Sequence, residues 1–181
     1  MPNSTTPVKT NWNVFTGAPC AGKTAVINAL AQRGYRIVPE VARAYIDSRL
    51  ALGISLETIK TDRLAFERHI LREKKAIESK LHSSELIFLD RAVPDSIAYY
   101  QFEGLNPIEA VEESCRVRYR HIFLFERLTF KKDPVRSETV DGAERIEALL
   151  IEGYHQLGYR PIRVRVMPVD QRVDFVLQYA I

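Results

Sequence analysis

Short apolar segments alternate with longer, more polar segments along the chain. The apolar segments predict β-strands at residues 12–16, 35–38, 85–90, 121–126 and 161–167. The segments between them predict helices at residues 25–32, 41–50, 55–81, 94–102, 106–117, 141–157 and 169–179. Because no two strands are joined by a tight hairpin, this order predicts an α/β fold, a three-layer α/β/α arrangement around a five-stranded parallel sheet.

Residues 55–81 form the longest predicted helix. Ser55 is suited to the N-cap, and no glycine or proline interrupts the chain from there to Leu81. Apolar residues recur at roughly helical spacing, whereas the heptads are too irregular to favour a coiled coil. The whole stretch 39–84 is far longer than the roughly dozen residues that a parallel crossover needs. We therefore predict a helical insertion that forms one wall of a cleft for a second substrate. The alternative is that this helix stabilises the fold or binds a partner.

The loop after the first strand matches the P-loop pattern G-x-x-x-x-G-K-[ST] at every fixed position. The alternative is a chance match in a glycine-containing loop. The predicted strand before the loop and the predicted helix after it are the context that the motif requires, and they favour a true P-loop over a chance match. Such a loop holds a polyphosphate with successive backbone N–H groups and with the positive end of the following helix. Its residues are candidate nucleotide ligands: Gly17, Ala18, Pro19, Cys20, Ala21, Gly22, Lys23 and Thr24.

The motif predicts ATP, or another nucleoside triphosphate, together with Mg²⁺ as its ligands. Lys23 would place its charge on the β- and γ-phosphates, and the Thr24 hydroxyl would bind Mg²⁺. Asp90 ends the third strand, where an acid in a P-loop fold binds the metal or orients the nucleophile; the alternative is an ordinary Asx turn. Cys20 is either a small filler or a reactive thiol.

Three residues at strand ends suggest a catalytic and substrate-binding site for a phosphoryl acceptor. Glu40, after the second strand, would accept the proton of an acceptor hydroxyl as a general base, and Arg43 would bind the substrate. Alternatively, Glu40 is a first-turn acid that interacts with the helix dipole, and Arg43 is exposed. Arg91, next to the strand-terminal acid, is either a phosphate clamp or a solvated turn residue.

A basic, proline-containing segment at residues 127–140 follows the fourth strand and is a candidate lid. Closing it over the triphosphate would exclude water and bring an arginine onto the charge that develops at the γ-phosphoryl group. We take Arg136 as that catalytic cation; the alternative is a solvated basic loop. The cations of the segment are Arg127, Lys131, Lys132 and Arg136.

The composition fits one globular domain at residues 12–181, after a flexible tail at residues 1–11. Hydrophobic residues make up 46% and charged residues 27% of the 181, so a substantial core is expected. The net charge of +3 suits an anionic small molecule and does not predict nucleic-acid binding. Cys20 and Cys115 lie far apart, which favours a reducing, cytoplasmic compartment, and no apolar run is long enough to predict a membrane span.

Five further stretches carry a resemblance to a known family: Val38–Arg43, Leu89–Ser96, Phe125–Arg127, Asp133–Thr139 and Val169–Phe175. With the P-loop, they resemble the small predicted-ATPase family labelled AAA, which is similar to the kinase half of NadR. The resemblance covers nearly the whole chain after the tail. It implies the P-loop kinase fold and ATP or another nucleoside triphosphate as ligand, and it leaves the acceptor open.

The resemblance also implies roles for single residues. Asp90 would be the Walker B-type acid, residues 127–138 would be the lid, and the turn from Val169 to Arg172 would border the nucleotide base. On the nucleotide side, the added candidates are Arg127, Val169, Asp170 and Arg172. On the acceptor side, the candidates are Glu40, Arg43, Arg91 and Asp95.

These features favour a small-molecule kinase that moves the γ-phosphoryl group of Mg-ATP to a nucleoside- or nucleotide-like acceptor. The alternative is a nucleotide-dependent regulatory NTPase that acts on a protein partner. A nucleic-acid-processing ATPase is disfavoured by the mild charge and the lack of a recognisable reader module. The expected partners are a nucleotide and a small-molecule acceptor, without nucleic acid or membrane, and the expected state is a monomer or homodimer.

Overall fold

The structure, a computed structural model, describes residues 6–128 and 140–181, with residue 140 described in its backbone only. Arg136 and most of the predicted lid therefore lie outside the described residues. The elements, in chain order, are β1 (Val8–Lys9), β2 (Trp12–Thr16), α1 (Lys23–Gln32), β3 (Arg36–Val38), α2 (Val41–Ala51), α3 (Leu56–Ile59), α4 (Arg63–Glu78), β4 (Ile87–Asp90), α5 (Asp95–Phe102), α6 (Ile108–Ser114), β5 (Val117–Arg118), β6 (His121–Phe125), α7 (Val140–Gln156), β7 (Ile162–Val164) and α8 (Val169–Ala180).

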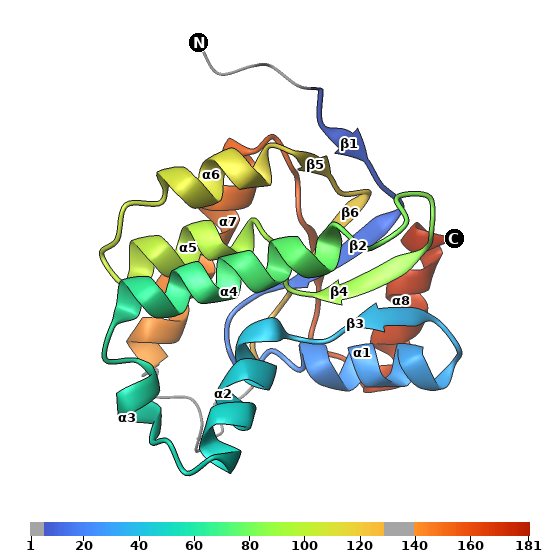
Figure 1. Cartoon of the computed structure of the whole chain (residues 1–181). Coiled ribbons are helices and arrows are strands. Elements are labelled where there is room, and N and C mark those ends of the chain that lie inside the picture. The colour runs from blue at the N-terminus through green and yellow to red at the C-terminus, as the bar shows by residue number, and fades with distance from the viewer. Residues whose placement is uncertain (1–5, 129–139) are drawn as a thin grey trace.

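Five strands form the central sheet in the order β3-β4-β2-β6-β7 (Figure 1). Every pair of neighbouring strands in this sheet is parallel, which confirms the predicted α/β fold. The strand that leads into the P-loop, β2, lies at the centre, and Phe15 on it is paired with Asp90 on β4. Because ligands bind such sheets beyond the carboxyl ends of the strands, the P-loop and Asp90 share the edge where a ligand is expected.

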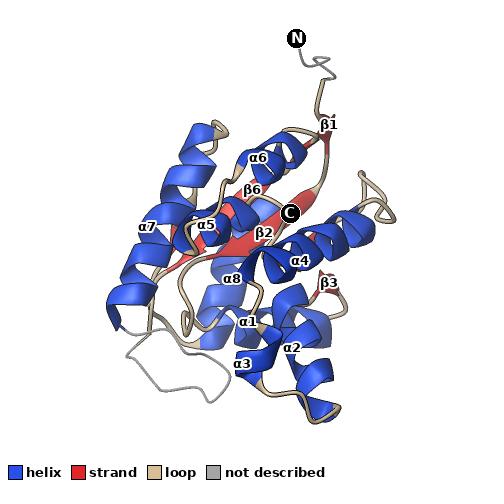
Figure 2. Cartoon of the chain, turned by 60° about the vertical axis from the view of Figure 1, so that its left-hand side comes forward, coloured by secondary structure: helices blue, strands red, loops and turns tan. Residues whose placement is uncertain are grey.

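Helices cover both faces of this sheet (Figures 1 and 2). On one face, Phe15 and Phe88 join Leu30 of α1 in a core cluster that also includes α8. On the opposite face, Val14 packs with Tyr154 of α7, beneath α4 and α5. Successive strand residues point to opposite faces, and both faces are covered, so the strands are continuously apolar rather than alternating.

The prediction of one helix over residues 55–81 is wrong. Ser55 does cap a helix, since its Oγ accepts a hydrogen bond from the Thr58 N–H at 3.2 Å, but that helix is the short α3. A second cap follows at Asp62, whose Oδ1 accepts from the Ala65 N–H at 2.9 Å and starts α4. The turn between the two caps lets the segment change direction (Figure 1), and residues of both helices line a cavity that is described below.

The predicted loose tail contains a short strand, and another begins at the last residue of the predicted helix at residues 106–117; the sequence patterns indicated neither. Val8–Lys9 forms β1, which pairs in parallel with Val117–Arg118 in β5. The Asn11 N–H also donates to the Ser83 carbonyl oxygen at 2.7 Å. The chain is therefore anchored to the domain before residue 12.

Replacing Gly17 tests how tightly the P-loop is packed against the sheet. Its φ of 129° is unfavourable for an L side chain, and a Cβ there would lie 2.5 Å from the Phe125 carbonyl oxygen. We expect Gly17→Ala to lower the free energy of unfolding by more than about 2 kcal/mol, measured by urea denaturation.

Gly34→Ala is the matched control, because Gly34 has a φ of 87° and no atom within 4 Å of its added Cβ. It should show only the backbone cost of about 1–2 kcal/mol. Equal losses for the two variants would mean that the close approach of the loop to β6 carries no energetic weight.

Candidate functional site

The P-loop joins the buried end of β2 to the start of α1. Gly17 and Gly22 have φ values of 129° and 78°, and Cys20 also has a positive φ of 62°. The side chain of Ala18 is buried beneath the loop. Positive φ at three positions curls the backbone tightly, which is the geometry that turns N–H groups into an anion-binding concavity.

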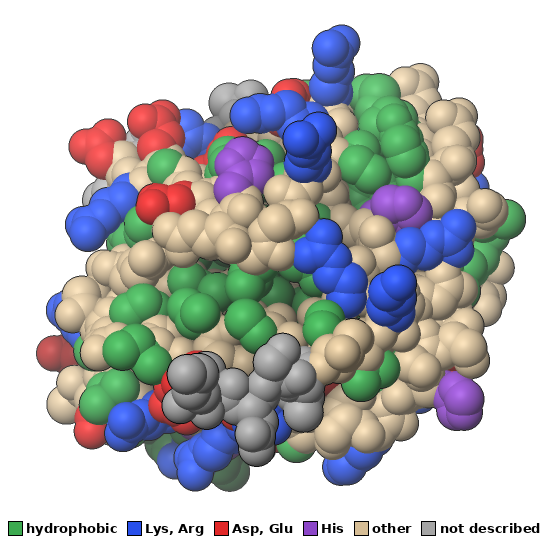
Figure 3. Space-filling model, turned by 90° about the horizontal axis from the view of Figure 1, so that it is seen from above, with side chains coloured by type: hydrophobic (Ala, Val, Ile, Leu, Met, Phe, Trp, Pro, Cys, Tyr) green, Lys and Arg blue, Asp and Glu red, His purple; other side chains and the backbone are tan. Residues whose placement is uncertain are grey.

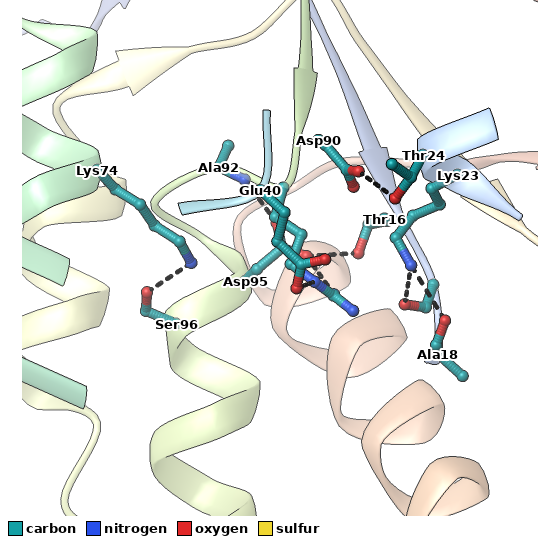
Figure 4. Close-up of polar contacts among 12 residues, drawn as sticks. Thr16, Ala18, Lys23, Thr24, Glu40, Lys74, Asp90, Ala92, Asp95 and Ser96 are labelled. Carbon is teal, nitrogen blue, oxygen red and sulfur yellow. Dashed lines mark hydrogen bonds and ion pairs between the residues drawn. The ribbon is translucent and has the colours of Figure 1, made fainter. Parts of the chain in front are cut away.

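The Lys23 ammonium lies across this loop. Its Nζ donates to the carbonyl oxygens of Gly17 at 3.1 Å and Ala18 at 3.0 Å, and only 3% of the residue is exposed (Figure 4). The positive charge is thus held over the loop, at the start of α1. This is the position from which a lysine can reach phosphate oxygens.

Thr24 and Asp90 approach each other from two elements (Figure 4). Thr24 Oγ1 donates to Asp90 Oδ2 at 3.0 Å, whereas no described residue bonds to the buried Oδ1 of Asp90. Burial raises the pKa of Asp90, and the Lys23 charge opposes that rise. A hydroxyl beside a buried carboxylate with an unused oxygen fits Mg²⁺, which prefers oxygen ligands. The bond across to α1, rather than to the following turn, speaks against the Asx-turn alternative.

Arg91 is buried between two acids rather than solvated. Its Nε donates to Glu40 Oε1 at 3.1 Å, its Nη1 donates to Asp95 Oδ1 at 3.2 Å, and its guanidinium lies 5.1 Å from the centre of the Tyr99 ring. Burial disfavours the charged form, but Tyr99, Glu40 and Asp95 outweigh it and raise the pKa of Arg91. Its φ of 68° is rare for a residue with a side chain, and such strain clusters at functional sites.

Asp95 lies behind Arg91 and does not line the acceptor cavity described below. It is fully buried and accepts four hydrogen bonds, from Thr16 Oγ1 at 2.8 Å, Arg91 Nη1 at 3.2 Å, Ala92 N–H at 3.0 Å and Tyr154 Oη at 2.6 Å. All of its acceptor capacity is used within the protein. This geometry suits a residue that positions Arg91 better than one that binds substrate directly.

A cavity of about 800 Å³ opens beside the P-loop, between α2, α3, α4 and α5. Pro19 of the P-loop, Glu40, Arg43 and Arg91 all line it, so four predicted site residues share one space. The stretch 39–84 supplies most of the remaining wall. The other residues that line the cavity are Ala42, Ile46, Leu56, Glu57, Lys60, Thr61, Arg63, Phe66, Glu67, Ile70, Lys74, Tyr99, Phe102, Glu103 and Gly142.

Helix α4 carries buried charged residues that the sequence analysis missed. Glu67, Lys74 and Glu78 are all at least 94% buried, and they share a helix face with Ile70. Lys74 Nζ donates to Ser96 Oγ at 3.0 Å (Figure 4), and burial lowers the pKa of Lys74. The sequence contains a sign of this burial: Lys74 and Glu78 follow Glu67 by seven and eleven residues, which places all three on the same side of the helix as its apolar residues.

Glu78 connects α4 to the loop after β4 and to Tyr119. Its carboxylate accepts from Tyr119 Oη at 2.6 Å and from the Val93 N–H at 3.1 Å. Burial raises the pKa of Glu78 to about 7, although both hydrogen bonds oppose that rise. Glu78 therefore keeps its proton in the folded chain to a higher pH than in the unfolded chain, whose value is 4.5.

Between these pKa values the folded state binds more protons than the unfolded state, so the stability contributed by Glu78 falls as pH rises. We expect the free energy of unfolding of the wild type, relative to Glu78→Gln, to drop by about 2–3 kcal/mol between pH 5 and pH 8. Urea denaturation across that range measures it, with Glu73→Gln on the exposed face of α4 as the control for losing a carboxylate. A difference that does not change with pH would contradict the prediction.

The remaining acceptor- and lid-side candidates are less buried. Arg43 lines the cavity and pairs with Asp47, with its Nε 3.1 Å from Oδ2. Arg127, just after β6, pairs with Glu144 of α7, with Nη2 3.1 Å from Oε1. Arg127 thus connects the end of β6 to α7, at the start of the segment that is predicted to form the lid.

The predicted base-side turn begins α8. Val169 is partly exposed, and Asp170 pairs with Arg33 of α1 at 3.4 Å. Arg172 is 2% exposed and reaches the P-loop from below, where its Nη1 donates to the Ala21 carbonyl oxygen at 2.8 Å. Burial lowers the pKa of Arg172. The structure therefore brings Arg172 to the P-loop, while Val169 and Asp170 lie at the surface.

Comparison with known proteins identifies the family. A family model described as "AAA domain" matches residues 12–172. The chain belongs to the AAA domain family. A search of curated protein sequences finds no match.

Solved structures give this AAA domain protein the fold of P-loop nucleotide kinases. The NadR protein in complex with NR is 16% identical with a TM-score of 0.68, over 94% of this chain and 51% of that one. Deoxyadenosine kinase from M. mycoides is 14% identical with a TM-score of 0.66, over 92% and 96%. Thymidylate kinase from Ehrlichia chaffeensis is 13% identical with a TM-score of 0.63, over 95% and 98%. The chain thus spans about half the length of the NadR chain.

Proposed function

We propose that this protein is a kinase for a small molecule. It transfers the γ-phosphoryl group of ATP, or of another nucleoside triphosphate, to a hydroxyl or phosphate of a nucleoside- or nucleotide-like acceptor. The observation that carries the proposal is the cavity of about 800 Å³ that Pro19 of the P-loop shares with Glu40 and Arg91. A nucleotide switch that only hydrolyses its ligand would need no second-substrate cavity at this place.

On the donor side, the P-loop N–H groups hold the phosphates, and Lys23 neutralises charge on the β- and γ-phosphates. Thr24 and Asp90 would hold Mg²⁺, which supplies charge neutralisation at the phosphates when it is bound. Arg172 adds a buried positive charge beneath the loop, 2.8 Å from Ala21. These groups are preorganised by contacts within the chain, so they need little rearrangement when charge develops.

On the acceptor side, Glu40 is the candidate general base. Its carboxylate is 14% exposed, faces the cavity and accepts a bond from Arg91 Nε at 3.1 Å. The hydroxyl of an acceptor would donate to Glu40, which takes its proton as the oxygen attacks phosphorus. Arg91, held by Asp95 from behind, orients Glu40 and offers positive charge to the group being transferred. Arg43 at the rim is proposed to bind the acceptor, and Arg136 stays a prediction.

Other properties of the chain agree with this proposal. Figure 3 shows the protein seen from above, where hydrophobic, basic and acidic side chains all reach the surface. Among the described residues, no helix is long and apolar enough to cross a membrane. Both cysteines are free thiols, which agrees with a reducing, cytoplasmic location. The three named structural neighbours are described as a NadR protein in complex with NR, a deoxyadenosine kinase and a thymidylate kinase.

The decisive test measures ADP formation with Mg²⁺ and ATP across a panel of nucleosides, nucleotides and ribosylnicotinamide. We expect one acceptor class to raise turnover well above the rate with water. Lys23→Ala should remove that stimulation, by on the order of 10²-fold or more, because the charge on the transferring phosphates is lost. Lys9→Ala, on exposed β1, is the matched control and should keep wild-type turnover. Tight nucleotide binding without stimulation by any acceptor would favour the regulatory NTPase instead.

Asp90→Asn separates nucleotide binding from turnover. The variant keeps the shape of the side chain but loses the charge that would hold the metal, so we expect nucleotide binding to persist while turnover falls on the order of 10²-fold. Fluorescent-nucleotide binding and ADP release measure the two effects. Asp174→Asn, at an exposed ion pair with Arg33, serves as the control. Wild-type turnover in Asp90→Asn would return this residue to a structural role.

A further inference from the structure

Glu67 is a buried carboxyl that opens on the acceptor cavity. The residue is 5% exposed and lines the cavity from α4. Within the part of the chain that the structure describes, none of the hydrogen bonds involves its carboxylate. Its oxygens are not among the fully enclosed atoms that lack a partner, so they face the cavity, where the donor group of a ligand can reach them.

The position of Glu67 along α4 separates it from Lys74 in the wall of the cavity. Lys74 lies seven residues later on the same helix face, which is about 10 Å along the axis. The Lys74 ammonium bonds to Ser96, next to the Asp95 that holds Arg91. The ring of an acceptor bound in this cavity would therefore meet Glu67 about two turns of α4 away from the Lys74–Ser96 contact.

The surroundings of Glu67 suit a flat ring. Phe66 and Ile70 lie beside it on α4, Ile46 comes from α2, and Phe102 comes from α5. Apolar and aromatic walls with few polar groups are typical of pockets that bind heterocycles, in which the polar groups decide the orientation.

Charged groups on α4 itself and in the segments beside α3, β4 and α5 act on Glu67. Burial raises the pKa of Glu67 to about 7. The positive charges of Lys74 on α4, Lys60 before α4 and Arg91 after β4 oppose that rise in pKa, whereas the negative charge of Glu103 after α5 adds to it. Glu103 is itself paired with Arg63 at 3.1 Å. Above about pH 7 the Glu67 carboxylate can only accept hydrogen bonds, so it attracts N–H donors and repels a keto oxygen.

We propose that Glu67 selects the acceptor, favouring a nucleoside-like molecule whose ring carries an exocyclic amino group over the matched molecule with a keto oxygen. This rests on the proposed function only in that both place the acceptor in the same cavity. A site that is built to hydrogen-bond one group rejects the analogue that lacks it, because its own polar group is then left unpaired.

The test is isothermal titration of the full chain with two matched pairs, cytidine against uridine and adenosine against inosine. Mg²⁺ and AMP-PNP are present at saturation, so that no transfer occurs and binding is measured apart from catalysis. At pH 8 we expect the wild type to bind the amino member of at least one pair about tenfold or more tightly than the keto member. This preference should shrink as pH falls through about 7, when the carboxyl gains its proton.

Glu67→Gln should bring the ratio within the pair close to one and remove its pH dependence, because an amide both donates and accepts. Glu73→Gln removes an exposed acid of the same helix, outside the cavity, and should keep the wild-type ratio. Equal wild-type affinity within both pairs, failure of all four compounds to bind, or an unchanged ratio in Glu67→Gln would overturn the proposal. So would an equal loss for both members, which would assign Glu67 to the sugar.

The outcomes remain distinct from those of the kinase assay. Loss of acceptor-stimulated ADP formation with an intact amino preference would overturn the proposed reaction and leave the role of Glu67 standing. Acceptor-stimulated turnover without any amino preference would do the reverse.

Discussion

The Asp95 carboxylate is the buried contact on which the acceptor side of the site depends. It accepts hydrogen bonds from the end of β2 through Thr16, from the loop through Arg91 and Ala92, and from α7 through Tyr154. Losing one of these donors would leave charge buried without compensation, so the loop after β4 is held in one arrangement. That arrangement keeps Arg91 at a φ of 68° and directs its guanidinium to Glu40.

Their hydrogen-bond partners divide the buried acids into two groups. Asp95 and Glu78 use their oxygens within the protein, and they connect the sheet, α4, α7 and the loop after β4. Asp90 and Glu67 are as deeply buried, yet Oδ1 of Asp90 has no hydrogen-bond partner among the described residues, and Glu67 lines the acceptor cavity. Acids of the first kind support structure, and acids of the second kind lie where a cation or a ligand donor can approach.

The five strands of the central sheet, the P-loop and the place of Asp90 at a strand end were predictable because their signals are local. A buried parallel strand is continuously apolar, and the P-loop pattern is contiguous from Gly17 to Thr24. The error over residues 55–81 was also local, since Asp62 is a cap that was overlooked within an otherwise uninterrupted pattern. Glu67 and Lys74 were missed for another reason: charged residues on a helix are ordinarily solvated, and only the packing of α4 against α5 shows that these are buried.

The order of elements, the curled phosphate loop and the acids at strand ends follow from neighbours along the chain, which decide backbone geometry and apolar periodicity. Which polar groups are satisfied, and where a cavity remains, depends instead on contacts between distant segments. Lys74 meets Ser96 from 22 residues away, Tyr154 meets Asp95 from 59, and Thr16 meets Asp95 from 79. Such contacts form only when the sheet and both helical layers come together, because burial and low polarity arise from packing that no single segment can provide.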